Sequence, residues 1–258
     1  MKPILYYNPL SPFAHKCRVA LIERGVAFDL KLPDSFGTGD PDTAFLALNP
    51  RGEVPVLIDG EAVIWDSPII LRYIQDRWPL DTAVPQTPAA RAQSEMIELV
   101  CDTRLDPVHW GLGEAKWFGR VSGEKLDRLM ERSRAQSSAI LAWLQDQLGD
   151  EPWFNGTSFG DIDACVAIHV SRGVGHGLAP DLEGGLGKWL ARAQQRPSVA
   201  EVLTSADAWF GSLTPEDIAR WMTAKRQYRD HRLAWMIDAS GFETIADAHS
   251  AGRLFITT

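Results

Sequence analysis

The 258-residue sequence lacks the features that mark membrane, secreted and disulfide-rich proteins. No apolar run approaches the ~20 residues that cross a bilayer, and the N-terminus has no hydrophobic signal-peptide segment. The three cysteines, Cys17, Cys101 and Cys165, are far apart and odd in number, which argues against a disulfide framework or a metal site. We therefore expect a cytoplasmic protein with buried, reduced thiols that does not bind a membrane.

The sequence also lacks an excess of positive charge. Its formal net charge is -8 and its pI is near 5.3, which disfavours nucleic acid or an anionic membrane as a partner. Hydrophobic residues at 45% and charged residues at 23% are typical of a globular protein. The chain contains no internal repeat, and its length suffices for one large domain or two ordinary ones.

Local signals predict alternating strands and helices in the first part of the chain. Ser11 followed by Pro12 indicates a helix start, because serine caps a helix and proline is favoured in the first turn. Asp59-Gly60 between two aliphatic runs indicates a tight β-hairpin. The expected elements are strands at 2–7 and 26–32, helices at 12–24 and 42–48, a loop at 33–41, a hairpin at 56–65 and a helix at 68–76. This order requires a sheet covered by helices.

The segment from Glu53 to Ser67 is the one around which the chain is organised. Pro55 opens an apolar strand and cannot donate to its ladder, so the backbone of Val54 is free to bind something other than the sheet. A cis peptide between these two residues would suit such a turn. Asp66 or Ser67 caps the next helix. A strand edge beside a helix N-terminus can hold an extended peptide with a carboxylate.

The rest of the sequence predicts a helical domain. Residues 79–88 are rich in proline and polar residues and indicate a linker. Ser158 with Asp161 is a variant of the capping box at the start of a core helix, and the tail beyond Trp209 is too apolar to be disordered. The expected helices lie at 89–107, 122–148, 162–169 and 187–195. The expected domains are residues 1–79, a linker at 80–88, a helical domain at 89–210, and an extension at 211–258 packed on the helical domain.

Four segments, in their order and spacing, resemble the soluble glutathione S-transferase family. Each alone would be a weak match, but together they are specific. The segments are SPFAHKCRVAL at 11–21, NPRGEVPVL at 49–57, WDSPIILRYI at 65–74 and FNGTSFGDIDA at 154–164. The resemblance implies a thioredoxin-like α/β N-terminal domain that binds glutathione, followed by an all-α domain that binds an electrophile. It also implies a homodimer, with a heterodimer as the alternative.

The resemblance assigns catalysis to Ser11. Only the thiolate of glutathione attacks an electrophile, so the protein must lower the pKa of the thiol. A hydroxyl that donates to the sulfur and the partial positive charge of a helix N-terminus both favour the thiolate. Family members with cysteine in this loop exchange thiols instead, so the serine indicates thiolate activation. Tyr6 and Tyr7 are alternatives, because other classes use a tyrosine near the end of the first strand.

The resemblance assigns the γ-glutamyl end of glutathione to Asp66 and Ser67. Asp66, where the family usually has glutamate, would hold the α-ammonium, and Ser67 with its backbone N–H would hold the α-carboxylate. Val54, next to Pro55, matches the residue whose backbone pairs with the cysteinyl part.

The glycyl carboxylate of glutathione is assigned less directly. Arg51 is either its partner or a solvated surface arginine. Glu53 stands where many relatives have glutamine, and its carboxylate would repel glutathione unless Arg51 or Lys16 compensates it.

The candidates for the electrophile pocket come from two places in the sequence. Phe13 and His15 lie in the first helix, where His15 would face the second substrate, a subunit partner or solvent. Trp110 and Trp117 belong to an aromatic, glycine-punctuated stretch between helices, which is either a pocket wall or part of the core.

The predicted function is therefore transfer of glutathione to an apolar, aromatic electrophile. A specialised version, by analogy with members that carry C-terminal extensions, is glutathione-dependent cleavage of lignin-derived aryl ethers. A non-catalytic binding or interaction protein of the same fold is an alternative. So is a glutathione-dependent isomerase, although the serine- and tryptophan-rich motif of the best-known isomerase class is missing.

Overall fold

A computed structural model describes residues 2–34, 42–223 and 231–251 of the chain. Part of the predicted loop at 33–41 and residues 224–230 of the predicted extension lie outside these ranges. The chain divides into two compact units, one up to Met222 and one from Thr223 onward. In the described part of the chain, no helix combines the length and apolar character needed to cross a membrane.

The predicted order of strands and helices at the start of the chain is confirmed. The four-stranded sheet has the order β2-β1-β3-β4, in which β1 runs parallel to β2 and the other pairs are antiparallel. The parallel pair requires a crossover, which α1 supplies. The peptide bond between Val54 and Pro55 is cis. The elements are β1 (Ile4–Tyr6), α1 (Pro12–Glu23), β2 (Asp29–Lys31), α2 (Thr43–Leu48), β3 (Val56–Asp59), β4 (Ala62–Trp65) and α3 (Ser67–Arg77).

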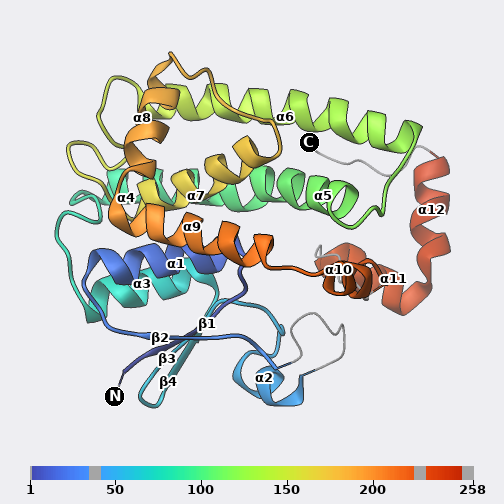
Figure 1. Cartoon of the computed structure of the whole chain (residues 1–258), viewed down its shortest axis with the longest axis horizontal. Helices are drawn as coiled ribbons and strands as arrows, with labels where there is room; N and C mark the ends of the chain where they lie inside the picture. Colours follow the sequence, from blue (N-terminus) through green and yellow to red (C-terminus); the bar gives the residue numbers. More distant parts are fainter. Residues whose placement is uncertain (1, 35–41, 224–230, 252–258) are drawn as a thin grey trace. The chain divides into compact units, whose positions relative to one another are not determined.

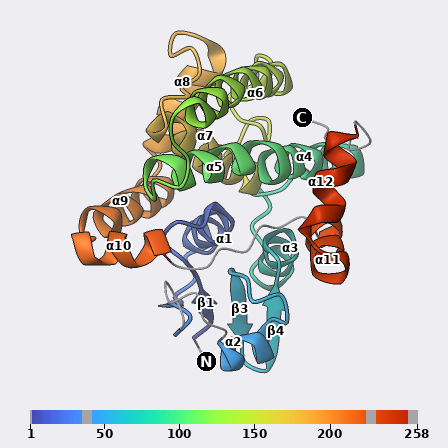
Figure 2. The same cartoon turned by 90° about the vertical axis from the view of Figure 1, so that its right-hand side faces the viewer.

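Both faces of the sheet are covered, as the thioredoxin-like prediction requires. Helices α1 and α3 pack on one face, where Leu5 and Leu57 of the central strands are fully buried with Leu21. On the other face Phe45 of α2 packs against Tyr6. Figures 1 and 2 show that α1 and α3 form a middle layer, with the sheet on one side and the helices α4 to α9 on the other.

The second part of the chain is helical, as predicted. Its core is centred on α7, whose residues pack around the fully buried Trp189. From Thr223 onward the described helices are α11 and α12, which pack against each other. The predicted packing of residues 211–258 on the helical domain stays a prediction. The helices are α4 (Pro88–Val100), η1 (Cys101–Leu105), α5 (Asp106–Lys116), α6 (Glu124–Leu148), α7 (Asp161–Gly175), α8 (Gly185–Gln194), α9 (Pro197–Gly211), α10 (Pro215–Thr223), α11 (His231–Ser240) and α12 (Phe242–Ser250).

The run α4–η1–α5 corrects one prediction about the aromatic stretch. Residues 108–111 lie inside α5 and not between helices. The predicted end near Pro107 is wrong, because proline in the first turn of a helix needs no N–H partner. The connecting element η1 is a π-helix, in which the Asp106 N–H donates to the Cys101 carbonyl. Such wide turns occur often at functional positions.

The capping box predicted at Ser158 and Asp161 is also wrong. The cap of α7 is Gly160, and the acidic partner is Asp163. The carboxylate of Asp163 accepts the N–H groups of Phe154 at 2.8 Å, Asn155 at 3.2 Å and Gly160 at 3.0 Å, and the indole N–H of Trp189 at 2.9 Å. Asp161 instead pairs with Arg24 of α1.

Candidate functional site

Ser11 stands at the head of α1, at the end of a short loop that follows β1. Its Oγ accepts the Ala14 N–H at 3.3 Å, a long and therefore weak cap bond. The loop is shaped by Asn8, whose side chain accepts the Leu10 N–H at 2.8 Å and whose carbonyl accepts the Ser11 N–H at 2.9 Å. Because a hydroxyl can accept and donate at once, the Ser11 proton remains available to a second partner.

The two tyrosine alternatives differ in their surroundings. Tyr6 is buried, and its ring packs against Phe45 with centroids 5.4 Å apart, on the side of the sheet covered by α2. The Lys31 ammonium lies 5.2 Å from the centroid of the same ring. Tyr7 is half-buried in the loop after β1. Of the two, Tyr7 is nearer to Ser11 in the sequence, whereas Tyr6 is committed to the packing beneath α2.

Asp66 has a backbone conformation that favours glycine. Its φ is 76°, and a non-glycine residue in this region is strained by about 1–3 kcal/mol. Asp66 precedes α3 but makes no side-chain cap bond to it, so its carboxylate is directed elsewhere. The next residue, Ser67, is buried at the first position of α3, and its carbonyl accepts a weak hydrogen bond from Cys17 Sγ at 3.8 Å. The start of α3 therefore packs against the middle of α1.

Arg51 is neither free nor simply solvated. One guanidinium nitrogen lies 2.9 Å from Glu53 Oε2 and another lies 3.0 Å from Asp66 Oδ2, while its side chain is 36% exposed. The charge of Glu53 is therefore compensated by Arg51. The alternative, compensation by Lys16, is wrong, because Lys16 is buried against α4. Val54 and Pro55 come just before β3, so the Val54 backbone is not committed to the ladder.

His15 is buried, so the interpretation of an exposed helix histidine is wrong. Its burial, together with the charges of Arg172 and Arg18, lowers the pKa of His15 to about 3, and its ring is therefore neutral. The ring is bonded to the backbone of Pro9 in the loop that carries Ser11. Phe13, half-buried in the first turn of α1, meets the ring of His169 edge to face at 6.1 Å.

The two tryptophan candidates lie on α5 and just after it. Trp110 is half-buried. Trp117 contacts Phe210 of α9 at 5.0 Å and His176 at 4.8 Å between ring centroids. The structure therefore groups Trp117 with aromatic residues from α9 and from the end of α7. A hollow of about 590 Å³ between α6 and residues 177–186 is lined by none of the candidate residues.

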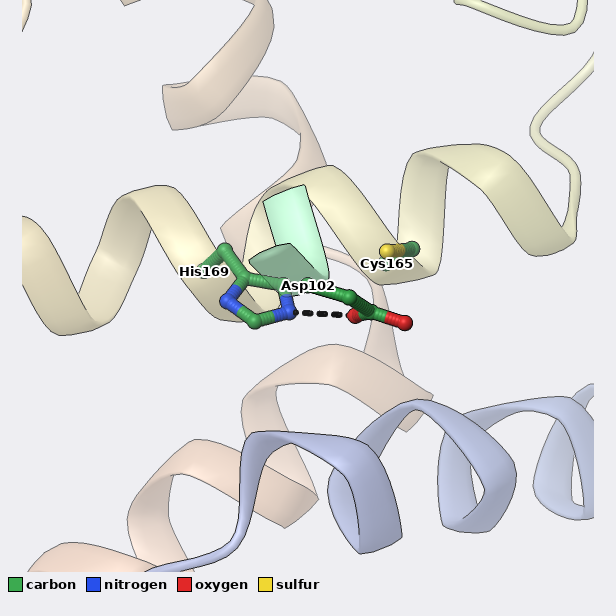
Figure 3. Close-up of side chains that lie close together, drawn as sticks. All are labelled: Asp102, Cys165 and His169. Atoms are coloured by element: carbon green, nitrogen blue, oxygen red, sulfur yellow. Dashed lines mark hydrogen bonds and ion pairs between the residues drawn. The ribbon is translucent and has the colours of Figure 1, made fainter. Parts of the chain in front are cut away.

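Sequence reasoning missed a buried network of charged side chains between α1, α4, η1 and α7. The Lys16 ammonium is bonded to Glu98 at 2.7 Å and to Asp102 at 2.6 Å. The other oxygen of Asp102 lies 3.1 Å from His169 Nε2, and Cys165 lies one turn before His169 on α7 (Figure 3). The acids Glu98 of α4 and Asp102 of η1, four residues apart and opposite a lysine on the buried face of α1, are the signal that could have revealed it.

The positive charges of this network come from its own side chains, His169 and Lys16. Burial lowers the pKa of His169, but hydrogen bonds to Asp102 and Cys165 outweigh it and raise that pKa to about 9. The ligand atoms of Asp102, Cys165 and His169 lie within 4.8 Å of one another, a spacing that suits a metal ion. However, the Lys16 ammonium is bonded to the same carboxylate and already supplies a positive charge there. We therefore describe the cluster as an ion network between helices.

Comparisons with known proteins identify the family. Residues 10–77 match the family described as "Glutathione S-transferase, N-terminal domain". The chain is 35% identical over 168 residues to glutathione S-transferase 1 of Dianthus caryophyllus, covering 64% of this chain and 75% of that protein. It is 30% identical over 164 residues to a stringent starvation protein A homolog of Pasteurella multocida (strain Pm70), covering 63% and 71%.

The solved structures give the same result for the fold. The theta class glutathione S-transferase from Xanthomonas axonopodis pv. citri, with glutathione bound, is 26% identical to this chain. The two superpose with a TM-score of 0.65, covering 78% of this chain and 96% of that chain. The relatives therefore include proteins named glutathione S-transferases and a protein named as a stringent starvation protein A homolog.

Proposed function

This chain belongs to the glutathione S-transferase superfamily, and from that premise we propose that it is a serine-type transferase that activates the thiol of glutathione. The observation that carries the proposal is the position of the Ser11 hydroxyl at the head of α1. Its oxygen accepts only a weak cap bond from the Ala14 N–H, and its proton remains available to another partner. Such a hydroxyl donates to the glutathione sulfur, and the N–H groups of the first helical turn add partial positive charge. Both stabilise the thiolate.

Glutathione is bound, in this proposal, between the heads of α1 and α3. The α-ammonium of its γ-glutamyl end pairs with Asp66, and the α-carboxylate takes the hydroxyl and the backbone N–H of Ser67. The cysteinyl part bonds to the backbone of Val54, next to Pro55. The Asp66 conformation supports this assignment, because strained residues that make no local cap bond are common at ligand sites.

Arg51 and Glu53 form the far end of the glutathione site. Arg51 is bonded to both Asp66 and Glu53. When the α-ammonium of glutathione takes its place at Asp66, the guanidinium is released to meet the glycyl carboxylate. Its pairing with Glu53 keeps that acid from repelling the same carboxylate.

The acceptor is an apolar, aromatic electrophile that reaches the sulfur from the side of the helical domain. In this proposal Phe13, Trp110 and Trp117 contribute aromatic surface to the acceptor's pocket, and the buried, neutral His15 ring behind it adds no charge that would attract an ionic substrate. Cleavage of an aryl ether of lignin type by the thiolate is a specialised form of this reaction. The three buried, unpaired cysteines support a reducing, cytoplasmic setting.

A binding protein without transferase activity is the second candidate. The observation that favours it is the internal pairing of Arg51 with Asp66 and Glu53, which occupies groups that glutathione would need. The similarity to a stringent starvation protein A homolog shows that proteins with other names share this fold.

The pKa of the bound thiol distinguishes the two candidates. We expect the wild-type protein to bind glutathione and to lower the pKa of its thiol by about one unit or more from ~8.5. The measurement is a pH titration of thiolate absorbance with saturating protein. Binding without a lowered pKa would favour the binding protein, and absence of binding would contradict both candidates.

We also propose that two copies of the chain associate through α3 and α4. Ile69 of α3 and Met96 and Leu99 of α4 are apolar side chains that are each more than half exposed. The two helices are neighbours, since Arg72 of α3 and Glu95 of α4 pair at 2.9 Å. An apolar patch of this kind marks an interaction surface.

We expect light scattering to give the mass of two chains for the wild type, and of one chain for Leu99→Asp, because a buried carboxylate without a partner disfavours association. The matched control is Leu182→Asp, which changes an equally exposed leucine just before α8. If the control dissociates as well, or the wild type has the mass of one chain, this interface is wrong.

A further inference from the structure

Arg172, near the end of α7, reaches the loop that carries Ser11. Its Nη1 donates to the carbonyl of Leu10 at 2.9 Å. Leu10 comes immediately before Ser11 in the chain, whereas Arg172 is 162 residues away. The bond therefore joins the helical part of the molecule to the backbone next to the proposed catalytic hydroxyl.

The side chain of Arg172 is held in a confined, charged environment. It is 16% exposed, and Nη1 also lies 3.5 Å from the carboxylate of Asp106 at the start of α5. Burial lowers the pKa of Arg172, and the carboxylate of Asp106 opposes that shift. The other titratable groups that face it are His15, His109 and His176. Without the guanidinium, the Leu10 carbonyl and Asp106 would both lose a partner in a place with little water.

The other bonds described for this loop are local. Asn8 accepts the N–H groups of Leu10 and Ser11 from within the loop, and the His15 ring is bonded to Pro9 from the first turn of α1. Arg172 belongs to a different element and holds the next carbonyl along the chain, that of Leu10. The bond from Arg172 therefore fixes the loop relative to α7 and the other helices of the helical part, where the proposed acceptor would bind.

A second arginine shows that the two helices are clamped at both ends. Arg24, at the end of α1, binds Asp161 at the start of α7 with two nitrogens, each at 2.9 Å from a carboxylate oxygen. Arg172 acts at the opposite end of the same antiparallel pair of helices. Both arginines join α7 to α1 or its preceding loop, but only Arg172 does so beside Ser11. Arg24 is therefore a matched control for Arg172.

We propose that Arg172 is a positioning residue, which holds the loop at Asn8–Ser11 so that the Ser11 hydroxyl is directed toward the glutathione sulfur. The inference rests on the proposed role of Ser11. A displacement of about 1 Å at a reacting group can reduce the rate by about 100-fold, and the planar fork of arginine fixes a carbonyl in a way that a lysine does not.

The test compares Arg172→Met, Arg172→Lys and the control Arg24→Met. For Arg172→Met we expect amide hydrogen exchange at Leu10 and Ser11 to become about tenfold faster, because the loop opens more readily. We expect the pKa of the bound thiol to rise by about one unit and kcat near neutral pH to fall about tenfold, with KM for glutathione within about twofold. Arg172→Lys should restore only part of these losses.

Arg24→Met should lower thermal stability at least as much as Arg172→Met does. It should leave amide hydrogen exchange at Leu10 and Ser11, and the pKa of the bound thiol, as in the wild type. The inference is overturned if Arg172→Met leaves exchange unchanged, if the thiol pKa does not follow the exchange, or if Arg24→Met shifts both equally. If Arg172→Met does not fold, Arg172→Lys is judged by the same criteria. A wild type that binds glutathione without lowering its thiol pKa overturns the proposed function, whereas the exchange rates still report whether Arg172 holds the loop.

Discussion

Ser11→Ala is expected to raise the pKa of the bound glutathione thiol by about one unit or more, or ~1.4 kcal/mol per unit. The substitution removes the hydroxyl donor but keeps the N-terminus of α1, so part of the stabilisation of the thiolate remains. Loss of one such donor reduces kcat by about 10²-fold in other enzymes, and we expect a reduction of about 10- to 100-fold at neutral pH. KM for glutathione should change little, because in the proposed site Asp66 and Ser67 hold the other end of the molecule.

The control for Ser11→Ala is Thr87→Ala. Thr87 caps α4 through a bond of 3.2 Å from the Ala90 N–H and is followed by a proline, as Ser11 is. Both substitutions should cost about 1 kcal/mol of stability through the lost cap, but only Ser11→Ala should change the titration. If Ser11→Ala titrates like the wild type, the activating group is a backbone N–H or a tyrosine, and Tyr6→Phe and Tyr7→Phe decide between them.

Asp163→Ala should lower the free energy of unfolding by about 3–5 kcal/mol, the largest stability effect we expect from one substitution. The carboxylate is fully buried and accepts four N–H groups, three from the backbone before α7 and one from Trp189. An alanine would leave these donors without an acceptor in the core, where each unpaired group costs about 1–3 kcal/mol. Urea unfolding measures the loss as a lower midpoint.

A surface aspartate provides the comparison for Asp163→Ala. Asp181 accepts one backbone N–H, from Glu183 at 3.1 Å, in an exposed loop where water can replace it. Asp181→Ala should therefore cost no more than about 0.5 kcal/mol. Asp163→Asn keeps one acceptor oxygen, so its loss of unfolding free energy should lie between those of Asp163→Ala and Asp181→Ala. A loss below about 1 kcal/mol for Asp163→Ala would show that the bonds around this carboxylate contribute little.

Much of the α/β part of the fold could be predicted, because its signals are local. Ser11-Pro12 marks the start of α1, and Asp59-Gly60 marks the hairpin, through conformational preferences that act over a few residues. The internal pairing of Arg51 in the proposed glutathione site joins groups no more than 15 residues apart, on either side of that same hairpin. The pairing of Arg51 with Glu53 could be proposed from the sequence, whereas its pairing with Asp66 could not.

The environment of α1 could not be predicted, because it depends on distant parts of the chain. A helix with one exposed face would place Lys16 and His15 in water. However, α1 lies between α3 and the sheet on one side and α7 and α9 on the other, so it has almost no exposed face. Lys16 is buried against acids 82 and 86 residues away. No pattern within the helix itself reports such a partner.

The wide turn of η1 makes the number of residues in one helix as important as their identity. Glu98, Asp102 and Asp106 follow each other at four-residue steps, and their carboxylates meet Lys16 and Arg172. In a regular α-helix each step would advance about 40° around the axis, because a turn holds about 3.6 residues. The wider turn offsets this drift and keeps the three acids facing α1 and α7. Deletion of one residue here would rotate Asp106 away from Arg172 while leaving every side chain chemically intact, so the length of this helix is itself a condition for the bond between Arg172 and Asp106.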